Sequence, residues 1–215
     1  MLTVFAALAA LAIGYLCGSL PSGLWLGRTL RGVDVRTLGS GNLGATNVYR
    51  SLGPGIGIAT LVLDIAKGAL PVWFLPGSAL GAHFPGGPEW CGLVVGLAAI
   101  AGHMWSVFAR FRGGKGVATA AGVLLAISPP AFGVCLAVFV AAVGLTRFIS
   151  VGSMLGAVAF AITLGLMRGP ASPTALFGMV VAALVILRHR DNIGRLMRGE
   201  ERRFTFRPAK AERAT

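Results

Sequence analysis

The chain has 215 residues, of which 55% are hydrophobic and only 12% are charged. A soluble domain usually carries about 25% charged residues, and the mean hydropathy of +0.79 also argues against a soluble protein. The formal net charge is +12. The basic residues lie between apolar segments and near the C-terminus, which favours anionic lipid headgroups or phosphorylated substrates as partners over nucleic acid.

The apolar segments predict an all-α integral membrane protein. A spanning helix needs about 20 mostly apolar residues. No Lys or Arg precedes the first apolar run, so we interpret it as a retained membrane helix and not a cleaved signal peptide. Ser128-Pro129-Pro130 should separate two spans, because proline lacks the amide that a helix needs. The predicted spans are 3–27, 55–75, 89–109, 117–128, 130–146, 150–167 and 173–187. The fourth is short, and six or eight spans remain open if 117–146 is divided differently.

The basic residues orient this bundle of about seven transmembrane helices. With the N-terminus outside and the C-terminus cytoplasmic, the inner segments 28–54, 110–116, 147–149 and 188–215 hold 17 of the 19 Lys and Arg residues. The outer loops then hold only Arg168, as the excess of positive charge in cytoplasmic loops requires. We expect a single polytopic domain over 1–204 and a polar tail over 205–215.

The first inner cluster, residues 39–50, reads GSGNLGATNVYR. Glycines let backbone amides turn toward an anion, and Arg50 could grip a phosphate with two hydrogen bonds. The three glycines also match GxGxxG, with Asp64 about 20 residues on, but a dinucleotide site needs a preceding strand and here a membrane helix precedes. An ordinary polar turn between helices is the competing interpretation.

The second inner cluster, residues 102–119, reads GHMWSVFARFRGGKGVAT. Its GGKG core places Lys115 at the start of a helix, where free amides and the helix dipole favour anions. It is not a Walker A loop, because Ala109 and Gly116 stand where glycine and Ser or Thr are required. The basic residues could instead be simple membrane anchors, and His103 is more often packed than reactive in such a place.

The third inner cluster, residues 188–201, reads RHRDNIGRLMRGEE. His189 and Asn192 are three positions apart, so they share a face if the segment is one helix. A basic amphipathic tail lying on anionic lipid is the alternative. Within the second span, Asp64 and Lys67 are costly charges that either neutralise each other or place Lys67 at the phosphate site.

The runs SGNLGATN, GHMWSVFARFRGGKGVAT and RHRDNIGRL resemble the three signature segments of the bacterial acyl-phosphate:glycerol-3-phosphate acyltransferase family, in order and spacing. The sequence departs from the usual pattern at Trp105-Ser106 and at Arg202, beside the motifs. The resemblance implies catalytic roles for Ser40, Lys115, His189 and Asn192. Together with the amide-nest argument, it also implies substrate or phosphate contacts for Gly41, Asn42, Gly44, Thr46, Asn47, Arg50, Lys67, Gly113, Gly114, Gly116 and Thr119.

The resemblance implies transfer of an acyl group from acyl phosphate to the 1-hydroxyl of glycerol 3-phosphate at the cytoplasmic face of the bacterial inner membrane. No cofactor or metal is expected. Membrane lipid and transient contact with the enzyme that makes acyl phosphate complete the expected partners. None of the three histidines is followed by Asp five positions on, so the HxxxxD box of CoA-dependent and carrier-protein-dependent acyltransferases is missing. A transporter for an anionic solute and a lipid-binding scaffold are the alternatives.

Overall fold

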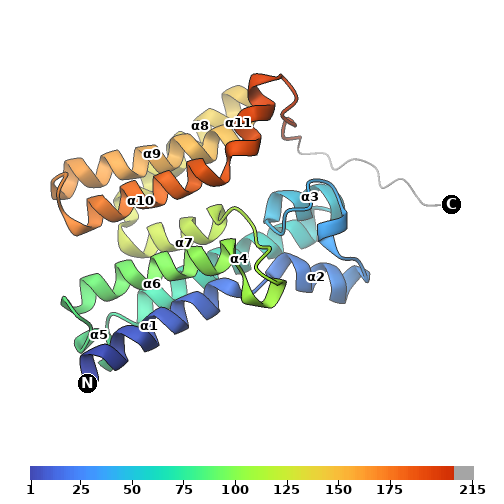
Figure 1. Ribbon diagram of the computed structural model, residues 1–215. Coiled ribbons are helices and arrows are strands. Elements are labelled where there is room, and N and C mark those ends of the chain that lie inside the picture. The colour runs from blue at the N-terminus through green and yellow to red at the C-terminus, as the bar shows by residue number, and fades with distance from the viewer. Residues whose placement is uncertain (206–215) are drawn as a thin grey trace.

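The computed structural model describes residues 1–205, which form a bundle of α-helices with no strand in that range (Figure 1). All but the first residue of the predicted tail therefore lies outside the described residues. The longer helices are α1 (Leu2–Ser19), α4 (Pro54–Phe74), α6 (Gly87–Met104), α7 (Val117–Ile127), α8 (Pro129–Thr146), α9 (Ile149–Arg168) and α10 (Pro173–Arg188). The short helices are α2 (Ser22–Arg31), α3 (Ala45–Leu52), α5 (Ala79–Ala82) and α11 (Arg190–Met197), with single 3-10 turns η1 (Val35–Thr37) and η2 (Val107–Ala109).

Each of the seven predicted spans corresponds to one of the longer helices, but not all of them can cross a membrane unaided. Within residues 1–205, five helical segments are long and apolar enough to do so, and α10 with α11 would form a sixth, bent by 55°. The 11 residues of α7 extend about 17 Å at 1.5 Å per residue, less than the hydrocarbon core. The break predicted at Ser128 is confirmed, since α7 ends before it and α8 begins after it.

The predicted first span, 3–27, is interrupted in the structure. α1 ends at Ser19 and α2 begins at Ser22, because Pro21 has no amide with which to continue the helix. The combined segment Leu2–Arg31 still qualifies as a single candidate span. The break frees the carbonyls of Ser19 and Leu20 to accept hydrogen bonds from Ser106, which precedes η2, and from Lys67 in α4.

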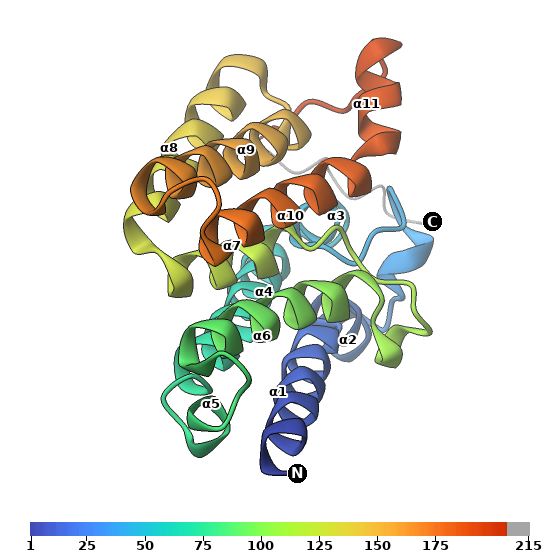
Figure 2. The same cartoon turned by 60° about the vertical axis from the view of Figure 1, so that its left-hand side comes forward.

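Close helix contacts build two parts of the bundle. α1 packs mainly on α6 and α4 on α7, whereas α8, α9 and α10 form a second group (Figures 1 and 2). A side chain at Gly102 would collide with the backbone of α1, and one at Gly68 with the backbone of α7. Small residues at such crossings let membrane helices approach closely. α6 is the most buried of the candidate spans.

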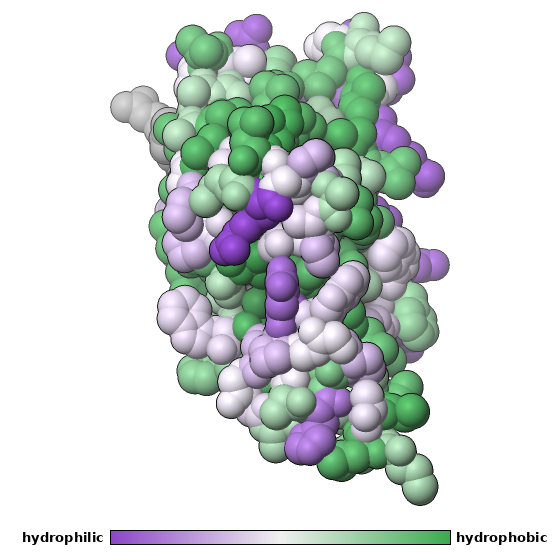
Figure 3. All heavy atoms as spheres, turned by 90° about the vertical axis from the view of Figure 1, so that its left-hand side faces the viewer, coloured by the Kyte–Doolittle hydropathy of each residue, from purple (hydrophilic) through white to green (hydrophobic). Residues whose placement is uncertain are grey.

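The polar connections gather at one end of the bundle. The α2–α3 and α6–α7 connections and α11 lie at the right of Figure 1, whereas the N-terminus and α5 lie at the opposite end. Figure 3 shows that opposite end, where strongly hydrophilic groups are few and are separated by neutral and apolar ones. The three inner clusters of the sequence therefore share one end of the molecule.

Candidate active site at the polar end of the bundle

The predicted site residues come from several helices and loops of the fold. The α2–α3 loop and α3 carry Ser40, Gly41, Asn42, Gly44, Thr46, Asn47 and Arg50. α4 carries Lys67, the loop before α7 carries Gly113, Gly114, Lys115 and Gly116, and α7 itself carries Thr119. His189 lies at the bend between α10 and α11, and Asn192 lies in α11.

Asn47 organises the loop of the first segment. Its buried amide nitrogen donates to the carbonyls of Leu38 (3.1 Å) and Asn42 (2.9 Å), and its Oδ1 accepts from the Ser40 amide at 2.9 Å. The Asn47 side chain is thus occupied within the loop, which gives it a structural role there. Ser40 itself lies on the exposed side. The loop backbone is left-handed at Gly41 (φ +69°), a conformation that favours glycine.

The glycine-rich loop folds back onto the end of α6. The Gly113 amide donates to the Met104 carbonyl (3.2 Å) and the Gly114 amide to the His103 carbonyl (3.1 Å). The GGKG pattern predicts that amides of this loop bind an anion, but the amides of Gly113 and Gly114 already donate to carbonyl groups. What the loop presents is Lys115, whose ammonium donates to Asn192 Oδ1.

The third segment is bent, not one continuous helix. α10 ends at Arg188 and α11 starts at Arg190, so His189 caps the helix that carries Asn192 instead of sharing its face. His189 is buried, and its Nδ1 lies 2.7 Å from the Val185 carbonyl. A carbonyl only accepts, so Nδ1 carries a proton and Nε2 of the neutral ring is the remaining acceptor.

The C-terminal segment 200–205 ties the first and third segments together. Glu201 accepts hydrogen bonds from Ser150 Oγ (2.8 Å), Asn192 Nδ2 (2.5 Å) and Arg195 Nε (2.8 Å). The next carbonyl, that of Arg202, accepts from Arg50 Nη2 at 3.2 Å. A continuous chain of contacts therefore links Arg50 in α3, the C-terminal segment, Asn192 and Lys115.

Burial and charge set the ionisation of this network. Burial lowers the pKa of Lys115 to about 8, although the nearby Glu201 carboxylate favours the charged ammonium. Burial alone would raise the pKa of Glu201, but hydrogen bonds from Asn192, Ser150 and Arg195 hold it below its usual range. The site thus keeps a carboxylate close to a lysine whose pKa is about 8.

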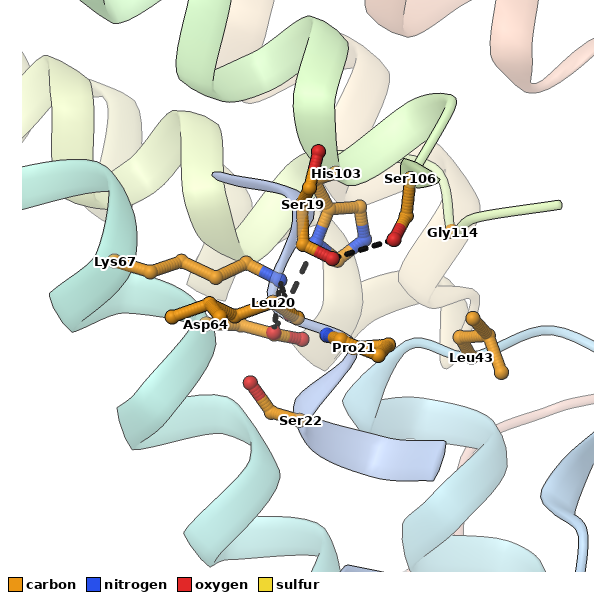
Figure 4. A pocket seen from close by; sticks show the side chains of 10 residues that line it. All are labelled: Ser19, Leu20, Pro21, Ser22, Leu43, Asp64, Lys67, His103, Ser106 and Gly114. Atoms are coloured by element: carbon orange, nitrogen blue, oxygen red, sulfur yellow. Dashed lines mark hydrogen bonds and ion pairs between the residues drawn. The ribbon is translucent and has the colours of Figure 1, made fainter. Parts of the chain in front are cut away.

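A small pocket under the glycine-rich loop contains the charges of the second span (Figure 4). Lys67 Nζ lies 2.7 Å from Asp64 Oδ1 and donates to the Leu20 carbonyl at 2.7 Å. Neither carboxylate oxygen of Asp64 accepts a well-aligned hydrogen bond. The pair is neutralised, as one sequence interpretation proposed, and it also lines the same pocket as Gly114 and Leu43.

Three residues at this end were given no role by the sequence argument. Arg188 Nη2 donates to the Gly114 carbonyl (2.9 Å), and its guanidinium lies 5.7 Å from the centre of the Trp105 ring. Glu201 is the central acceptor of the network. His103 Nδ1 lies 3.0 Å from Thr119 Oγ1. The pair Glu200-Glu201 within a basic run was a signal for Glu201, whereas Arg188 resembles any basic residue at the end of a span.

A bundle of apolar helices with cations and amide side chains gathered at one end defines a membrane protein that handles an anionic ligand. A family model described as "Glycerol-3-phosphate acyltransferase" matches residues 8–199. The chain belongs to this family, and it is accordingly a membrane glycerol-3-phosphate acyltransferase.

Individual relatives agree over nearly the whole chain. A glycerol-3-phosphate acyltransferase of Desulforudis audaxviator is 44% identical over 208 residues, covering 96% of this chain and 100% of the relative. One of Geobacter sulfurreducens is 48% identical over 196 residues, covering 90% and 95%. A crystal structure of PlsY (YgiH), an integral membrane glycerol 3-phosphate acyltransferase in its glycerol 3-phosphate form, superposes with a TM-score of 0.83 at 38% identity and covers 93% of this chain and 96% of that one.

Proposed function

We propose that the protein transfers an acyl group from acyl phosphate to the 1-hydroxyl of glycerol 3-phosphate. The hydroxyl oxygen attacks the acyl carbonyl, the bond to the phosphate breaks, and the hydroxyl proton passes to a base. The products are 1-acyl-glycerol 3-phosphate, or lysophosphatidate, and inorganic phosphate. The observation that carries the proposal is the network of Lys115, Asn192 and Glu201, which places a titratable cation at the polar end of a membrane bundle.

Both substrates carry a phosphate, and the site offers more than one group for each. Lys115 and Arg50 supply positive charge from different elements, and Ser40 adds an exposed hydroxyl. The first amides of α7 have no partner inside the helix and favour an anion beside Lys115. Thr46, Asn42 and the glycines Gly41 and Gly44 shape the facing loop. Holding two anions in register would lower the barrier by proximity and charge stabilisation.

Acyl phosphate is the proposed donor because it needs little activation. It is a mixed anhydride with a good leaving group, so no nucleophilic triad is required, and the sequence contains neither a GxSxG elbow nor an HxxxxD box. A related PlsY has been crystallised in a lysophosphatidic acid form, which is consistent with the proposed product. An apolar acyl chain would enter from the bilayer beside a polar headgroup site.

His189 orients or binds substrate in this proposal and is not the sole base. Its Nε2 is an acceptor, but a phosphate oxygen of a substrate can take the hydroxyl proton equally well. Asn192 is held in one amide orientation by Lys115 on one side and Glu201 on the other. The hydrogen-bond donors of the site are therefore held in place before substrate binds.

The donor assignment is tested with purified protein in detergent, glycerol 3-phosphate and either palmitoyl phosphate or palmitoyl-CoA. We expect lysophosphatidate and phosphate from palmitoyl phosphate only. Product from palmitoyl-CoA alone would refute the donor assignment. Lys115→Ala should lose turnover sharply, whereas Arg112→Ala, a basic residue of the same loop without a role in the network, should not.

We further propose seven spans with the N-terminus outside, so that the site faces the cytoplasm of the bacterial inner membrane. The support is the distribution of basic residues, since the outer loops carry only Arg168. Glu200→Cys should react with an impermeant maleimide in inside-out vesicles and Ser78→Cys in right-side-out vesicles. The reverse pattern would overturn the orientation. Transient contact with the enzyme that makes acyl phosphate would then take place at the cytoplasmic face.

A further inference from the structure

We propose that His103 is a positioning residue, whose imidazole ring is the support on which the glycine-rich loop holds Lys115 at the site. The inference rests on the proposed anion-binding role of Lys115 and adds how that lysine is held. His103 lies at the end of α6, is 5% exposed, and is separated from Lys115 by 12 positions in the chain. Its side chain faces the pocket beneath the loop (Figure 4).

The contact between the ring and the loop leaves no spare room. A Cβ built on Gly114 would collide with His103 Nε2, and one built on Gly113 would collide with the His103 carbonyl oxygen. The same carbonyl accepts the Gly114 amide at 3.1 Å. Both glycines that precede Lys115 thus lie directly against His103, Gly113 against its carbonyl oxygen and Gly114 against its ring.

Two side chains lie near the Nδ1 edge of the ring. His103 Nδ1 lies 3.0 Å from Thr119 Oγ1 in α7, and 3.8 Å from Asp64 Oδ1 in α4. Thr119 is fully buried, so its hydroxyl has little freedom to turn elsewhere. Thr119 therefore also acts through His103 in the structure, although the sequence resemblance placed it among the anion contacts.

The loop carbonyl completes the arrangement from the opposite element. Arg188 Nη2 donates to the Gly114 carbonyl at 2.9 Å. Gly114 is thereby fixed at its amide by the His103 carbonyl, at its α-carbon by the His103 ring and at its carbonyl by Arg188. The next residue, Lys115, reaches Asn192. Moving the ring would shift the loop and with it the ammonium, since interiors of this kind transmit small displacements.

The two glycines provide a matched test of this arrangement. Gly114→Ala should collide with the ring and reduce kcat/KM for glycerol 3-phosphate by more than about tenfold, the effect of 1.4 kcal/mol. His103→Asn keeps a polar group near Thr119 but vacates the position of Nε2. The double variant Gly114→Ala/His103→Asn should therefore be more active than Gly114→Ala alone. Gly113→Ala collides with backbone, so adding His103→Asn should not rescue it.

The singly substituted His103→Asn and Thr119→Val proteins give a second measurement that does not depend on the glycine variants folding. We expect both to raise KM for a phosphorylated substrate more than they lower kcat, and to reduce the thermal shift that glycerol 3-phosphate produces. No rescue of Gly114→Ala in folded protein, equal rescue of Gly113→Ala, or a loss confined to kcat would overturn the proposal. Failure of wild-type turnover with palmitoyl phosphate would instead count against the proposed donor, because the glycerol 3-phosphate thermal shift still reports on the loop.

Discussion

The ammonium of Lys115 donates a hydrogen bond to Oδ1 of Asn192, which lies 77 positions later in the chain. The contact joins the loop that begins α7 to the helix that ends the bundle. Because the Asn192 amide nitrogen is used by Glu201, its oxygen must face the lysine. A half-buried cation, an amide and a carboxylate thus lie in a row across the site.

The first prediction concerns the alkaline side of the pH profile. The pKa of Lys115 is lowered to about 8 by burial, and in the proposed function the charged form binds phosphate. As pH rises through about 8 the free enzyme loses this charge, so kcat/KM for glycerol 3-phosphate should fall. Lys115→Arg stays protonated across this range, and its profile should lack the fall even if its activity is lower. An unchanged alkaline limb in that variant would contradict the assignment to Lys115.

The second prediction concerns the carboxylate of Glu201, which contacts Asn192 on the side away from Lys115. Glu201 favours the charged form of Lys115, so Glu201→Gln should lower the pKa of the lysine and move the fall in kcat/KM to lower pH. Glu200→Gln is the matched control, because Glu200 is exposed and is paired with Arg198 at 2.7 Å. Profiles of the two variants measured side by side should differ. If the pH at which kcat/KM falls is unchanged in Glu201→Gln, the carboxylate only holds the segment 200–205 in place and does not set the pKa of Lys115.

The third prediction separates an orienting histidine from a general base. Removing a general base typically costs about 10²–10⁴ in rate, whereas we expect His189→Asn to cost about tenfold in kcat. His83→Asn is the control, since His83 makes the same contact to the carbonyl four residues earlier but is exposed at the opposite end. Loss of three or more orders of magnitude in kcat with folded His189→Asn protein would restore the base role.

Much of the fold followed from the sequence because membrane helices leave long apolar runs. All seven predicted spans are helices, and the break at Ser128-Pro129 was predictable because proline has no amide. The break at Leu20-Pro21 was not predicted, since apolar residues continue on both sides of it. The bend at His189 was not predicted either, because no proline or glycine marks it.

The candidate site was predictable as three clusters, but not as a set of contacts. Residue types at the polar end indicated phosphate chemistry. The neighbouring sequence did not show, however, that the Asn47 side chain hydrogen-bonds to the backbone of its own loop. The amides of Gly113 and Gly114 looked free for an anion until the fold brought the end of α6 against them. Glu201 acquires its position through Ser150 in α9 and through Asn192 and Arg195 in α11. Such pairings depend on tertiary packing.

The last prediction concerns the ion pair inside the second span. Asp64 and Lys67 have side chains only 2% and 5% exposed, and removing one partner of a buried pair leaves an uncompensated charge that costs about 3–5 kcal/mol. Asp64→Asn should therefore lower the melting temperature in detergent clearly. Asp191→Asn should not, because that side chain is 78% exposed.

The double variant Asp64→Leu/Lys67→Met removes both charges and should recover most of the lost stability, since apolar replacement of a buried pair is often neutral. Its activity then distinguishes the two roles left open for Lys67. If Lys67 only neutralises Asp64, the stable double variant should keep its KM for both substrates. We expect instead that KM rises, because Lys67 lines the same pocket as Gly114. A stable double variant with wild-type kinetics would assign the pair to folding alone.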